Sequence, residues 1–431
     1  MELTIVGSGY VGTTVAACLA DAGHRVQALD IDASIVARIN AGESPIVEPG
    51  LEELIATHAG DRLVATSDYA NLPTGNLTML SIQTPTHDDG RIDVGPLAGA
   101  IESVGARLAE VLGPDDRHLV VIKSTVVPPA LETLRTALAE GFGDASGTVE
   151  LATNPEFQRE GHAVEDFRFP QKIVLGVESS WAETLLRELY QPVIDAADPV
   201  VIVTDPPTAA MIKYANNAFL AAKISLINDI GNACKAFGVD AYEVADAIGT
   251  DDRIGARFLR SGVGFGGSCF PKDVKALQGA ARDAGYDPMM LEAALAVNEH
   301  QPRRLVELLA ERIELADARV AVLGLAFKPG TDDIRNSRAI PVIERLREAG
   351  ATVVGYDPVA TTNMRSRFPD IEYTDTASEA LDGADGAVVV TDWDEFAALD
   401  DAFDAMADPV VVDGRRVIER RDGIEYVGLT W

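Results

Sequence analysis

The sequence predicts an α/β fold in which two doubly wound domains are joined by a long central helix. Three observations lead to this prediction. Short apolar strands alternate with helical segments in the first half, an unbroken helical stretch follows Asp205, and the alternation resumes after about residue 300. Strands that alternate with helices are typical of parallel sheets with helices on both faces. We therefore expect domains at residues 1–204, 205–300 and 301–431.

The first domain begins with a strand–turn–helix–strand unit. Residues 3–6 are an apolar strand, residues 7–12 a glycine-rich turn, and residues 13–22 a helix that Gly23 ends. The next strand is expected at residues 25–29. Later apolar runs predict further strands at residues 77–82, 119–122 and 173–175.

The central helix is expected to start at Asp205, because two prolines follow it and proline is tolerated in the first turn of a helix. The next glycines are Gly231 and Gly238. A helix over residues 208–237 would be about 45 Å long at 1.5 Å per residue. This length predicts a connection between domains and a surface through which two chains form a homodimer.

The last domain repeats the alternation of strand and helix. A helix is expected over residues 338–349, and strands at residues 319–324, 352–356, 387–391 and 410–413. These segments predict a second, smaller doubly wound sheet. The glycine-rich turn of the first domain is missing, and GLAFKPG stands in its place at residues 324–330.

The chain of 431 residues carries a formal net charge of −32. A hydrophobic content of 47% excludes a disordered acidic chain, and the charge excludes a basic nucleic-acid-binding protein. Arginine supplies 28 of the 36 basic residues and lysine only eight, while acidic residues are spread along the whole chain. Such a surface is typical of proteins that work in molar salt, which screens charge repulsion. An ordinary acidic surface is the alternative.

Three cysteines, Cys18, Cys234 and Cys269, lie too far apart in the sequence to indicate a disulfide framework or a metal cluster. No apolar run approaches the roughly 18 residues of a membrane span. The N-terminus lacks the basic region of a signal peptide. We therefore expect a cytoplasmic protein without a membrane, nucleic-acid or metal partner.

The turn Gly7-Ser8-Gly9-Tyr10-Val11-Gly12 matches GxGxxG between a strand and a helix, and Asp30 follows 18 residues later. The glycines permit close approach of a pyrophosphate to the helix N-terminus. Asp30 would accept hydrogen bonds from ribose hydroxyls and repel a 2′-phosphate, so we expect NAD rather than NADP. A glycine turn without a ligand is the alternative. Thr84-Pro85 and Ser124-Thr125 follow later strands at the carboxyl edge of the sheet, where ligands bind.

The segment from Gly264 to Asp273 is the main candidate for chemistry. Pro271 predicts that a helix starts near Cys269, where the helix dipole favours the nucleophilic thiolate. Asp273 lies one turn further on, so both side chains can share a helix face. A nucleophile beside a carboxylate suits covalent catalysis with a general base. The alternative for Cys269 is a buried packing thiol; Cys18 and Cys234 lie in apolar helical stretches and are expected in the core.

Two further pairs of polar residues are candidates. In NPEFQREG, Asn154 and Pro155 predict a helix start, which would place Glu156 and Glu160 on one face for acid–base chemistry. Glutamates at a helix start on the surface are the alternative. On the long helix, Lys213 and Asn217 lie four residues apart. Because lysine is rare in this chain, Lys213 is a candidate for chemistry, and a lysine whose ammonium group reaches solvent is the alternative.

A set of motifs occurs in order over nearly the whole chain: GSGYVG, ESPIVEPGLEEL, KSTVVP, NPEFQREG, KYANNAFLAAKISLIN, FGGSCFPKD, GLAFKPGTDDIRNS, TDWDEF and VVDGRR. Together they resemble the nucleotide-sugar dehydrogenase family, in particular its UDP-glucose branch. The resemblance implies two NAD-binding-type domains joined by a long helix that forms a dimer. It also implies oxidation of UDP-glucose to UDP-glucuronate with reduction of two NAD⁺.

The resemblance also assigns roles to residues. It makes Cys269 the nucleophile that forms a thiohemiacetal and then a thioester. Asp273, Glu156 and Thr125 would position and activate water, and Lys213 and Asn217 would stabilise an oxyanion. The implied cofactor site comprises Gly7, Gly9, Tyr10, Val11, Gly12, Asp30, Thr84, Pro85, Thr125 and Glu160. The implied substrate site comprises Glu156, Phe157, Lys213, Asn217, Arg253, Phe258, Phe265, Gly266, Lys328 and Arg415, with Arg253 reaching the substrate of a neighbouring subunit.

The chain also departs from the family pattern. Ile35 stands where Lys or Arg is common near the adenosine phosphates, which puts NAD affinity at low salt in question. The nearest alternative is GDP-mannose 6-dehydrogenase or another UDP-hexose or UDP-N-acetylhexosamine 6-dehydrogenase; enzymes for UDP-N-acetylmannosamine usually carry His where Ser268 precedes the cysteine. A two-electron hydroxyacid dehydrogenase would not need Cys269. The last alternative is a catalytically inactive binding protein.

Overall fold

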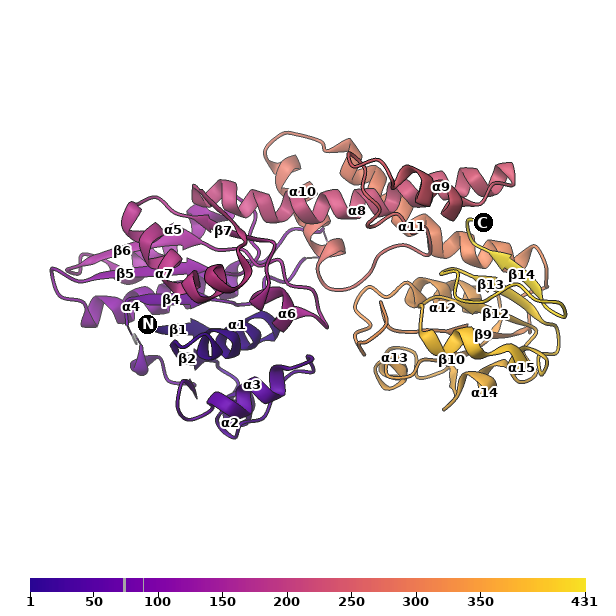
Figure 1. The fold of residues 1–431 in the computed structure, drawn as a ribbon, viewed down its shortest axis with the longest axis horizontal. Coiled ribbons are helices and arrows are strands. Elements are labelled where there is room, and N and C mark those ends of the chain that lie inside the picture. Colours follow the sequence, from indigo (N-terminus) through magenta and orange to yellow (C-terminus); the bar gives the residue numbers. More distant parts are fainter. Residues whose placement is uncertain (73–74, 88) are drawn as a thin grey trace. The chain divides into compact units, whose positions relative to one another are not determined.

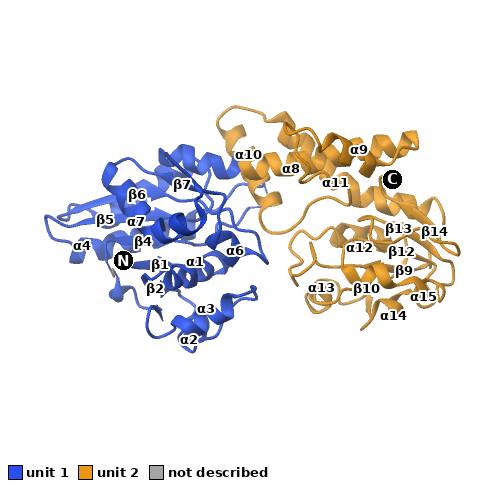
Figure 2. Cartoon of the chain, viewed as in Figure 1, with its two compact units in different colours: residues 1–215 blue, residues 216–431 orange. Residues whose placement is uncertain are grey.

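The computed structural model describes residues 1–72, 75–87 and 89–431. The chain divides into two compact units, Met1–Ala215 and Asn216–Trp431 (Figure 2). Each unit contains one sheet between layers of helices, as the sequence predicts (Figure 1).

Unit 1 contains an eight-stranded sheet with the order β3-β2-β1-β4-β5-β6-β7-β8. Its strands are β1 (Glu2–Val6), β2 (Arg25–Leu29), β3 (Leu63–Thr66), β4 (Leu77–Leu80), β5 (Arg117–Ile122), β6 (Thr148–Thr153), β7 (Lys172–Gly176) and β8 (Val200–Thr204). All strands expected in this half are present. Most consist mainly of apolar residues, which is typical of strands covered on both faces.

The sheet of unit 1 departs from the expected parallel arrangement at one edge. Strand β7 pairs with β6 in antiparallel orientation through Thr153 and Gly176, and β8 runs parallel to β7. The connection from β6 to β7 contains the short helix α6 (Ala163–Arg168) instead of a long crossover helix. Parallel neighbours require such a crossover, whereas antiparallel neighbours do not.

Helices cover both faces of this sheet (Figure 1). Leu3 and Ile5 of β1 face one core, which is covered by α1 (Tyr10–Asp21), α3 (Leu51–His58), α6 and α7 (Ser180–Ala197). Val6 and Leu80 face the opposite core, which is covered by α4 (Gly95–Val111) and α5 (Ala130–Phe142). Helix α2 (Ala33–Asn40) lies beside β3.

The long helix is α8 (Pro206–Phe237), with 32 residues. It confirms the expected central helix and its start directly after Asp205. The division between the two units falls within it, between Ala215 and Asn216. Across the described ranges, α8 included, no helix is both long enough and apolar enough to span a bilayer.

Unit 2 contains a six-stranded parallel sheet with the order β11-β10-β9-β12-β13-β14. Its strands are β9 (Arg319–Leu323), β10 (Thr352–Tyr356), β11 (Glu372–Tyr373), β12 (Gly386–Val389), β13 (Val410–Asp413) and β14 (Glu425–Gly428). The second doubly wound sheet predicted from the alternation is therefore confirmed.

Helices cover both faces of the sheet of unit 2. One face is covered by α11 (Met289–Ala310), α12 (Ala339–Glu348) and α13 (Thr361–Arg367), and the other by α14 (Ala377–Leu381) and α15 (Asp400–Phe403). Two further helices of this unit are α9 (Ala241–Ile248) and α10 (Phe270–Asp283). Helix α10 packs beside α11 and carries the segment in which the sequence places the reactive cysteine.

Candidate active site

The glycine turn after β1 has the stereochemistry that GxGxxG requires. Gly7 has φ +94°, and a Cβ there would lie 2.6 Å from the carbonyl oxygen of Ser81. At Gly12 a Cβ would lie 1.8 Å from the carbonyl oxygen of Gly7, so this glycine permits the close packing of helix and strand. At Gly9, the N-cap residue of α1, a Cβ would meet only the side chain of Gln83 at 3.9 Å. The backbone of Gly9 is therefore open to a phosphate group.

Asp30 lies directly after β2 and is half-buried beside this turn. Its carboxylate accepts hydrogen bonds from the backbone N–H of Ser8 at 2.6 Å and of Asp32 at 2.9 Å. These bonds orient the carboxylate, which keeps further lone pairs for ribose hydroxyls. The open backbone of Gly9 and the oriented carboxylate of Asp30 together fit a dinucleotide without a 2′-phosphate.

The equivalent position in unit 2 is built differently. Asp357 follows β10, is 3% exposed, and accepts hydrogen bonds from the N–H groups of Leu325 and Ala326 and from the indole of Trp393. Its other oxygen accepts two more backbone N–H groups, those of residues 359 and 360. The carboxylate of Asp357 is occupied by hydrogen bonds from the protein itself. It therefore cannot accept hydrogen bonds from a ribose, as Asp30 can at the equivalent position of the first sheet.

Polar residues after β4 and β5 meet at the edge of the first sheet. The hydroxyl of Thr84 donates to the carbonyl oxygen of Thr125 at 2.9 Å, and the Ser124 hydroxyl donates to that of Ile82 at 2.7 Å. Pro85 is the next residue along this loop. The structure therefore brings together the two loops that the sequence places at the carboxyl edge.

Tyr10 links the glycine turn to the segment that carries Glu160. Its hydroxyl accepts a hydrogen bond from the backbone N–H of Gly161 at 3.0 Å, and the carboxylate of Glu48 accepts from the same N–H at 2.9 Å. Glu160 is half-buried directly before this contact, while Val11 packs against the first core.

The segment after β6 corrects one expectation. Asn154 does not start a helix: residues 154–159 are irregular, and α6 begins only at Ala163. The reason is that the side chain of Asn154 bonds within the core. Its amide donates to the carbonyl oxygen of Val174 at 2.9 Å, and its oxygen accepts from Lys123 at 2.8 Å and from the Tyr190 hydroxyl at 2.5 Å. Glu156 and Glu160 therefore do not share a helix face.

Glu156 instead forms a buried ion pair with Lys213 of α8. The two charged atoms lie 2.9 Å apart, and the side chains are 8% and 5% exposed. The second carboxylate oxygen of Glu156 accepts the backbone N–H of Gln158 at 2.5 Å. The ring of Phe157 lies 5.4 Å from the Lys213 ammonium, within cation–π distance. Lys213 stays a candidate for chemistry, and the structure adds its carboxylate partner, which lies 57 residues away in the chain.

In unit 2, Cys269 is the N-cap residue of α10, as the position of Pro271 predicts. It is exposed, whereas Cys18 and Cys234 are buried, which confirms the expected division. Burial raises the pKa of the Cys18 thiol to about 12. Of the three cysteines, the exposed one at a helix N-terminus is therefore the one suited to act as a thiolate.

Asp273 lies one turn after Cys269 and is 2% exposed. Its carboxylate accepts a hydrogen bond from the Asn217 amide at 2.6 Å and pairs with the Lys272 ammonium at 2.7 Å. Asn217 lies on the part of α8 that belongs to unit 2 and is 4% exposed. The long helix thus orients the carboxylate next to the candidate nucleophile.

The glycine-rich loop before Cys269 is held by a residue that the sequence patterns do not single out. The side-chain oxygen of Asn298 accepts the N–H of Phe265 at 2.7 Å, and its amide donates to the Phe265 carbonyl oxygen at 3.1 Å. Gly264 has φ +101°, and a Cβ there would lie 2.4 Å from the Asn298 oxygen. At Gly266 a Cβ would lie 2.4 Å from the carbonyl oxygen of Asn336. No spacing signal marks Asn298, because its partners lie 33 residues away.

Two aromatic side chains line this part of unit 2. Phe265 is buried and meets the ring of Phe270 edge-on, with 6.0 Å between centroids. Phe258 is 40% exposed, 6.4 Å from the same ring, and has φ +64°. A bulky residue in the left-handed region is unusual, and such strained backbone conformations cluster at functional sites.

Besides Lys213, three basic residues are implied by the resemblance, and they have different surroundings. Arg415 donates to the carbonyl oxygens of Val390 at 2.8 Å and Gly264 at 3.2 Å, so it ties the sheet to the glycine loop. Lys328 lies 5.5 Å from the ring of Phe327, its neighbour in the chain. Arg253 pairs with Asp251 and is 88% exposed.

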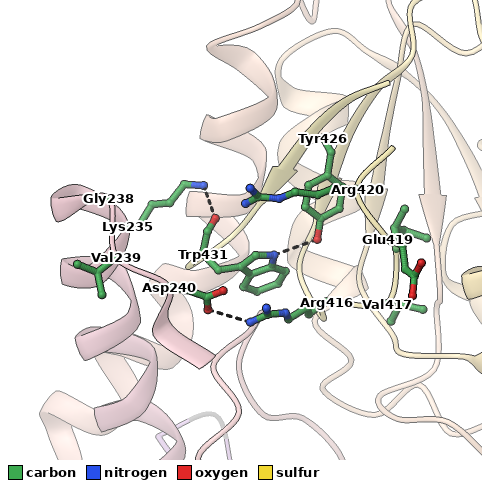
Figure 3. A pocket seen from close by; sticks show the side chains of 11 residues that line it. Lys235, Gly238, Val239, Asp240, Arg416, Val417, Glu419, Arg420, Tyr426 and Trp431 are labelled. Atoms are coloured by element: carbon green, nitrogen blue, oxygen red, sulfur yellow. Dashed lines mark hydrogen bonds and ion pairs between the residues drawn. The ribbon is translucent and has the colours of Figure 1, made fainter. Parts of the chain in front are cut away.

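A pocket of about 910 Å³ lies elsewhere in unit 2, and Figure 3 shows Lys235, Arg416, Arg420 and Trp431 around it. None of the predicted site residues lines it. Arg416 has φ +59° and forms an ion pair with Asp240 at 2.8 Å. Of the two consecutive arginines, Arg415 thus contacts the glycine loop and Arg416 lines the pocket.

Lys123 is a further residue that the sequence analysis missed. It directly follows β5, is 5% exposed, and donates to Asn154 and to the Tyr190 hydroxyl at 3.2 Å. Burial lowers the pKa of Lys123 to about 8, with Glu156 opposing and Lys213 adding to this shift. Because lysine is rare in this chain, Lys213 is a candidate for chemistry. The same argument applies to Lys123 and could have identified it from the sequence. Within the described ranges, no group of three or more His, Cys, Asp or Glu side chains is placed to hold a metal ion.

The two glycine positions give a matched test of the dinucleotide site. In Gly9→Ala the new methyl group has room, so we expect unchanged thermal stability but at least about tenfold weaker NAD⁺ binding, because the methyl group occupies the approach of the pyrophosphate. In Gly12→Ala the methyl group collides with Gly7, and we expect a loss of stability of several kcal/mol. Thermal unfolding and fluorescence titration measure both. Unimpaired NAD⁺ binding by folded Gly9→Ala would contradict the site.

Lys123 gives a test of pH dependence. Its pKa is about 8 in the folded protein against 10.5 in the unfolded chain, so at pH 7 burial of the charge costs about 3 kcal/mol. Between pH 8 and 10.5 the unfolded chain binds more protons, and this cost disappears as the pH rises. We expect Lys123→Met to be more stable than the parent at pH 7, with the difference shrinking toward pH 10 in denaturant unfolding. A less stable variant, or a difference independent of pH, would contradict this.

Comparison with known proteins agrees with this geometry. Three models of the UDP-glucose/GDP-mannose dehydrogenase family match: the NAD binding domain at residues 1–194, the central domain at 207–300 and the UDP binding domain at 321–420. The chain is 56% identical to UDP-glucose 6-dehydrogenase AglM of Haloferax volcanii over the full length of both, and 37% identical to UDP-glucose 6-dehydrogenase of Rhizobium meliloti over 100% of this chain and 98% of that protein.

A solved structure agrees as well. The UDP-glucose dehydrogenase of the hyperthermophilic archaeon Pyrobaculum islandicum superposes with a TM-score of 0.91 at 39% identity, covering 100% of this chain and 98% of that one. Full-length similarity in sequence and fold extends over the glycine turn, α8 and the segment around Cys269. The chain therefore belongs to the UDP-glucose/GDP-mannose dehydrogenase family and is an NAD-dependent dehydrogenase.

Proposed function

We propose that the protein oxidises the C6 alcohol of UDP-glucose to a carboxylate: UDP-glucose + 2 NAD⁺ + H₂O gives UDP-glucuronate + 2 NADH + 3 H⁺. The observation that carries this proposal is the 56% identity, over the full length of both chains, to a UDP-glucose 6-dehydrogenase. The exposed cysteine at the N-terminus of α10 supports a four-electron reaction, since a simple alcohol oxidation needs no nucleophile.

The proposed chemistry takes place at C6 of the sugar. Loss of a hydride and of the hydroxyl proton converts the alcohol to an aldehyde. The Cys269 thiolate then forms a C–S bond to C6, and the carbonyl oxygen takes up a proton to give a thiohemiacetal. Loss of a second hydride and of that proton gives a thioester. Water adds to C6, the C–S bond breaks, and the thiolate leaves as the carboxylate forms.

The cofactor role falls to residues of unit 1. Gly7, Gly9, Tyr10, Val11, Gly12, Asp30, Thr84, Pro85, Thr125 and Glu160 would hold NAD⁺. NAD⁺, when bound, supplies the hydride acceptor for both oxidations. The open backbone at Gly9 and the oriented carboxylate of Asp30 support this assignment.

Roles in the chemical steps follow from the contacts within each unit. In unit 1, Lys213 would stabilise the negative charge that develops on the C6 oxygen, while Glu156 and Thr125 would position water. In unit 2, Asn217 orients Asp273, which would act as a base beside Cys269. The proposed substrate residues are Phe157, Arg253, Phe258, Phe265, Gly266, Lys328 and Arg415, besides Glu156, Lys213 and Asn217.

The organisation of the protein in solution is also a proposal. The division at residues 1–204, 205–300 and 301–431 and a location in the cytoplasm stay predictions. We propose that the charge of −32 adapts the surface to molar salt, which the similarity to a haloarchaeal relative supports.

We also propose a homodimer through α8. Phe219, Leu226 and Phe237 lie on one side of that helix at helical spacing and are 73%, 58% and 79% exposed.

The dimer can be tested by placing a charge in this apolar stripe. In molar KCl the parent should sediment as a dimer, and Leu226→Arg should shift it toward the monomer, because the arginine would have to be desolvated in the interface. Val359→Arg, which adds the same charge at another exposed apolar residue of unit 2, is the control and should remain dimeric. A monomeric parent, or a dimer unaffected by Leu226→Arg, would exclude this interface.

The reaction can be tested by its stoichiometry. NADH formation is measured in molar KCl with a panel of UDP-glucose, UDP-galactose, UDP-N-acetyl sugars and GDP-mannose. We expect two NADH to form for each UDP-glucose consumed. Cys269→Ser should lose steady turnover by at least about a thousandfold while NAD⁺ still binds, because the thioester step fails. Cys234→Ala, at a buried cysteine, should retain activity. One NADH with accumulating aldehyde, or activity confined to GDP-mannose, would refute the proposal.

A further inference from the structure

Lys123 is buried in unit 1 next to the segment that carries Glu156. Its ammonium group lies 2.8 Å from the side-chain oxygen of Asn154 and 5.7 Å from the ring centroid of Tyr190. The charges of Glu156 and Lys213 both act on it. Two ammonium groups and one carboxylate therefore share a region in which all three side chains are less than 9% exposed.

Hydrogen bonding alone does not explain why this lysine is kept. The oxygen of Asn154 already accepts a bond from the Tyr190 hydroxyl at 2.5 Å, so it would stay satisfied without Lys123. Glu156 would still be paired with Lys213 at 2.9 Å. A charged group that costs folding free energy, and that a neutral side chain of similar size could replace, is typically retained for function. The chain as a whole has only eight lysines.

The count of fully buried charges indicates what Lys123 does; Lys172 of β7, which is only half-buried, is a further positive charge that acts on Lys213. Glu156 and Lys213 by themselves form a neutral pair, and a neutralised ammonium group stabilises an anion poorly. With Lys123 included, the buried group carries one net positive charge at neutral pH. We propose that Lys123 is a positioning residue that compensates the charge of Glu156, so that the carboxylate does not cancel the attraction of the Lys213 ammonium group for the oxyanion that develops at C6. This inference rests on the proposed function, in which the thiohemiacetal and thioester steps pass through such an anion.

The test compares two variants that each remove one donor to Asn154. Lys123→Met removes the charge and keeps the length of the side chain, whereas Tyr190→Phe removes the other hydrogen bond and leaves the charge. With UDP-glucose in molar KCl, we expect kcat of Lys123→Met to fall about tenfold to a hundredfold with KM for UDP-glucose within about threefold of the parent. Tyr190→Phe should keep kcat within about threefold. Circular dichroism and NAD⁺ titration establish that both variants are folded.

A second readout depends on the charge of Lys123 itself. Lys123 loses its proton above about pH 8 in the parent, whereas Lys123→Met has no such group. The groups that face it are Glu156 after β6, Lys213 of α8 and Tyr190 of α7, whose pKa burial raises well above its usual range. We therefore expect the ratio of parent to Lys123→Met kcat to shrink above pH 8. A residue that merely supports the fold would give a ratio independent of pH.

The outcomes separate this inference from the proposed function. A parent that reduces no NAD⁺ with UDP-glucose would overturn the proposed function; activity with another sugar of the panel would move the same comparison to that sugar. If the parent is active but Lys123→Met retains kcat within about threefold, the inference is wrong. Equal losses in Lys123→Met and Tyr190→Phe would show that the hydrogen bonds to Asn154 matter and the charge does not.

Discussion

Compensation of buried charge determines how the segment after β6 is built. Lys123, Glu156 and Lys213 are all withdrawn from water, and a buried charge without a partner costs several kcal/mol. Glu156 meets Lys213 at 2.9 Å, and Lys123 is held by Asn154. These contacts require an irregular conformation of residues 154–159, although the sequence of this segment favours a helix. The conformation of this segment follows from the charges that it has to satisfy.

The two sheets show how one topology is adapted to different tasks. Both begin with a strand, a turn containing a glycine in the left-handed region, and a second strand followed by an aspartate. Asp30 accepts two backbone N–H groups and remains half-buried, so it can still meet a ligand. Asp357 accepts four backbone N–H groups and an indole N–H, and is buried. A carboxylate committed to the protein's own donors stabilises its loop but offers a ribose nothing.

The net charge of −32 has to be reconciled with the binding of anionic ligands. Both proposed ligands are anionic, and the surface as a whole would repel them in dilute buffer. Salt screens exposed charges more than buried ones. Lys123 and Lys213 are buried and Arg415 is tied to the glycine loop, so the attraction that they exert persists in salt that weakens the repulsion from the surface. An acidic envelope is thus compatible with an enzyme for nucleotide sugars.

The sequence by itself determined the features that depend on neighbouring residues. These include the alternation of strand and helix, the glycine turn at residues 7–12, the long helix after Asp205, and the position of Cys269 at the start of α10. Each depends on the stereochemistry of a few consecutive residues, on helical periodicity, or on proline and glycine at helix ends. Such signals lie within one or two turns of the chain and need no distant partner.

Only the tertiary structure decided the features that depend on distant partners. Four features depend on contacts across 20 to 67 residues of the chain. They are the direction of β7, the irregular conformation after Asn154, the buried position of Lys123 and the hydrogen bonds of Asn298 to the glycine loop. Local propensity at Asn154 and Pro155 favours a helix start, and it lost to three side-chain hydrogen bonds in the core. Buried polar groups have to find partners wherever the fold supplies them, and the order of residues does not state where that is.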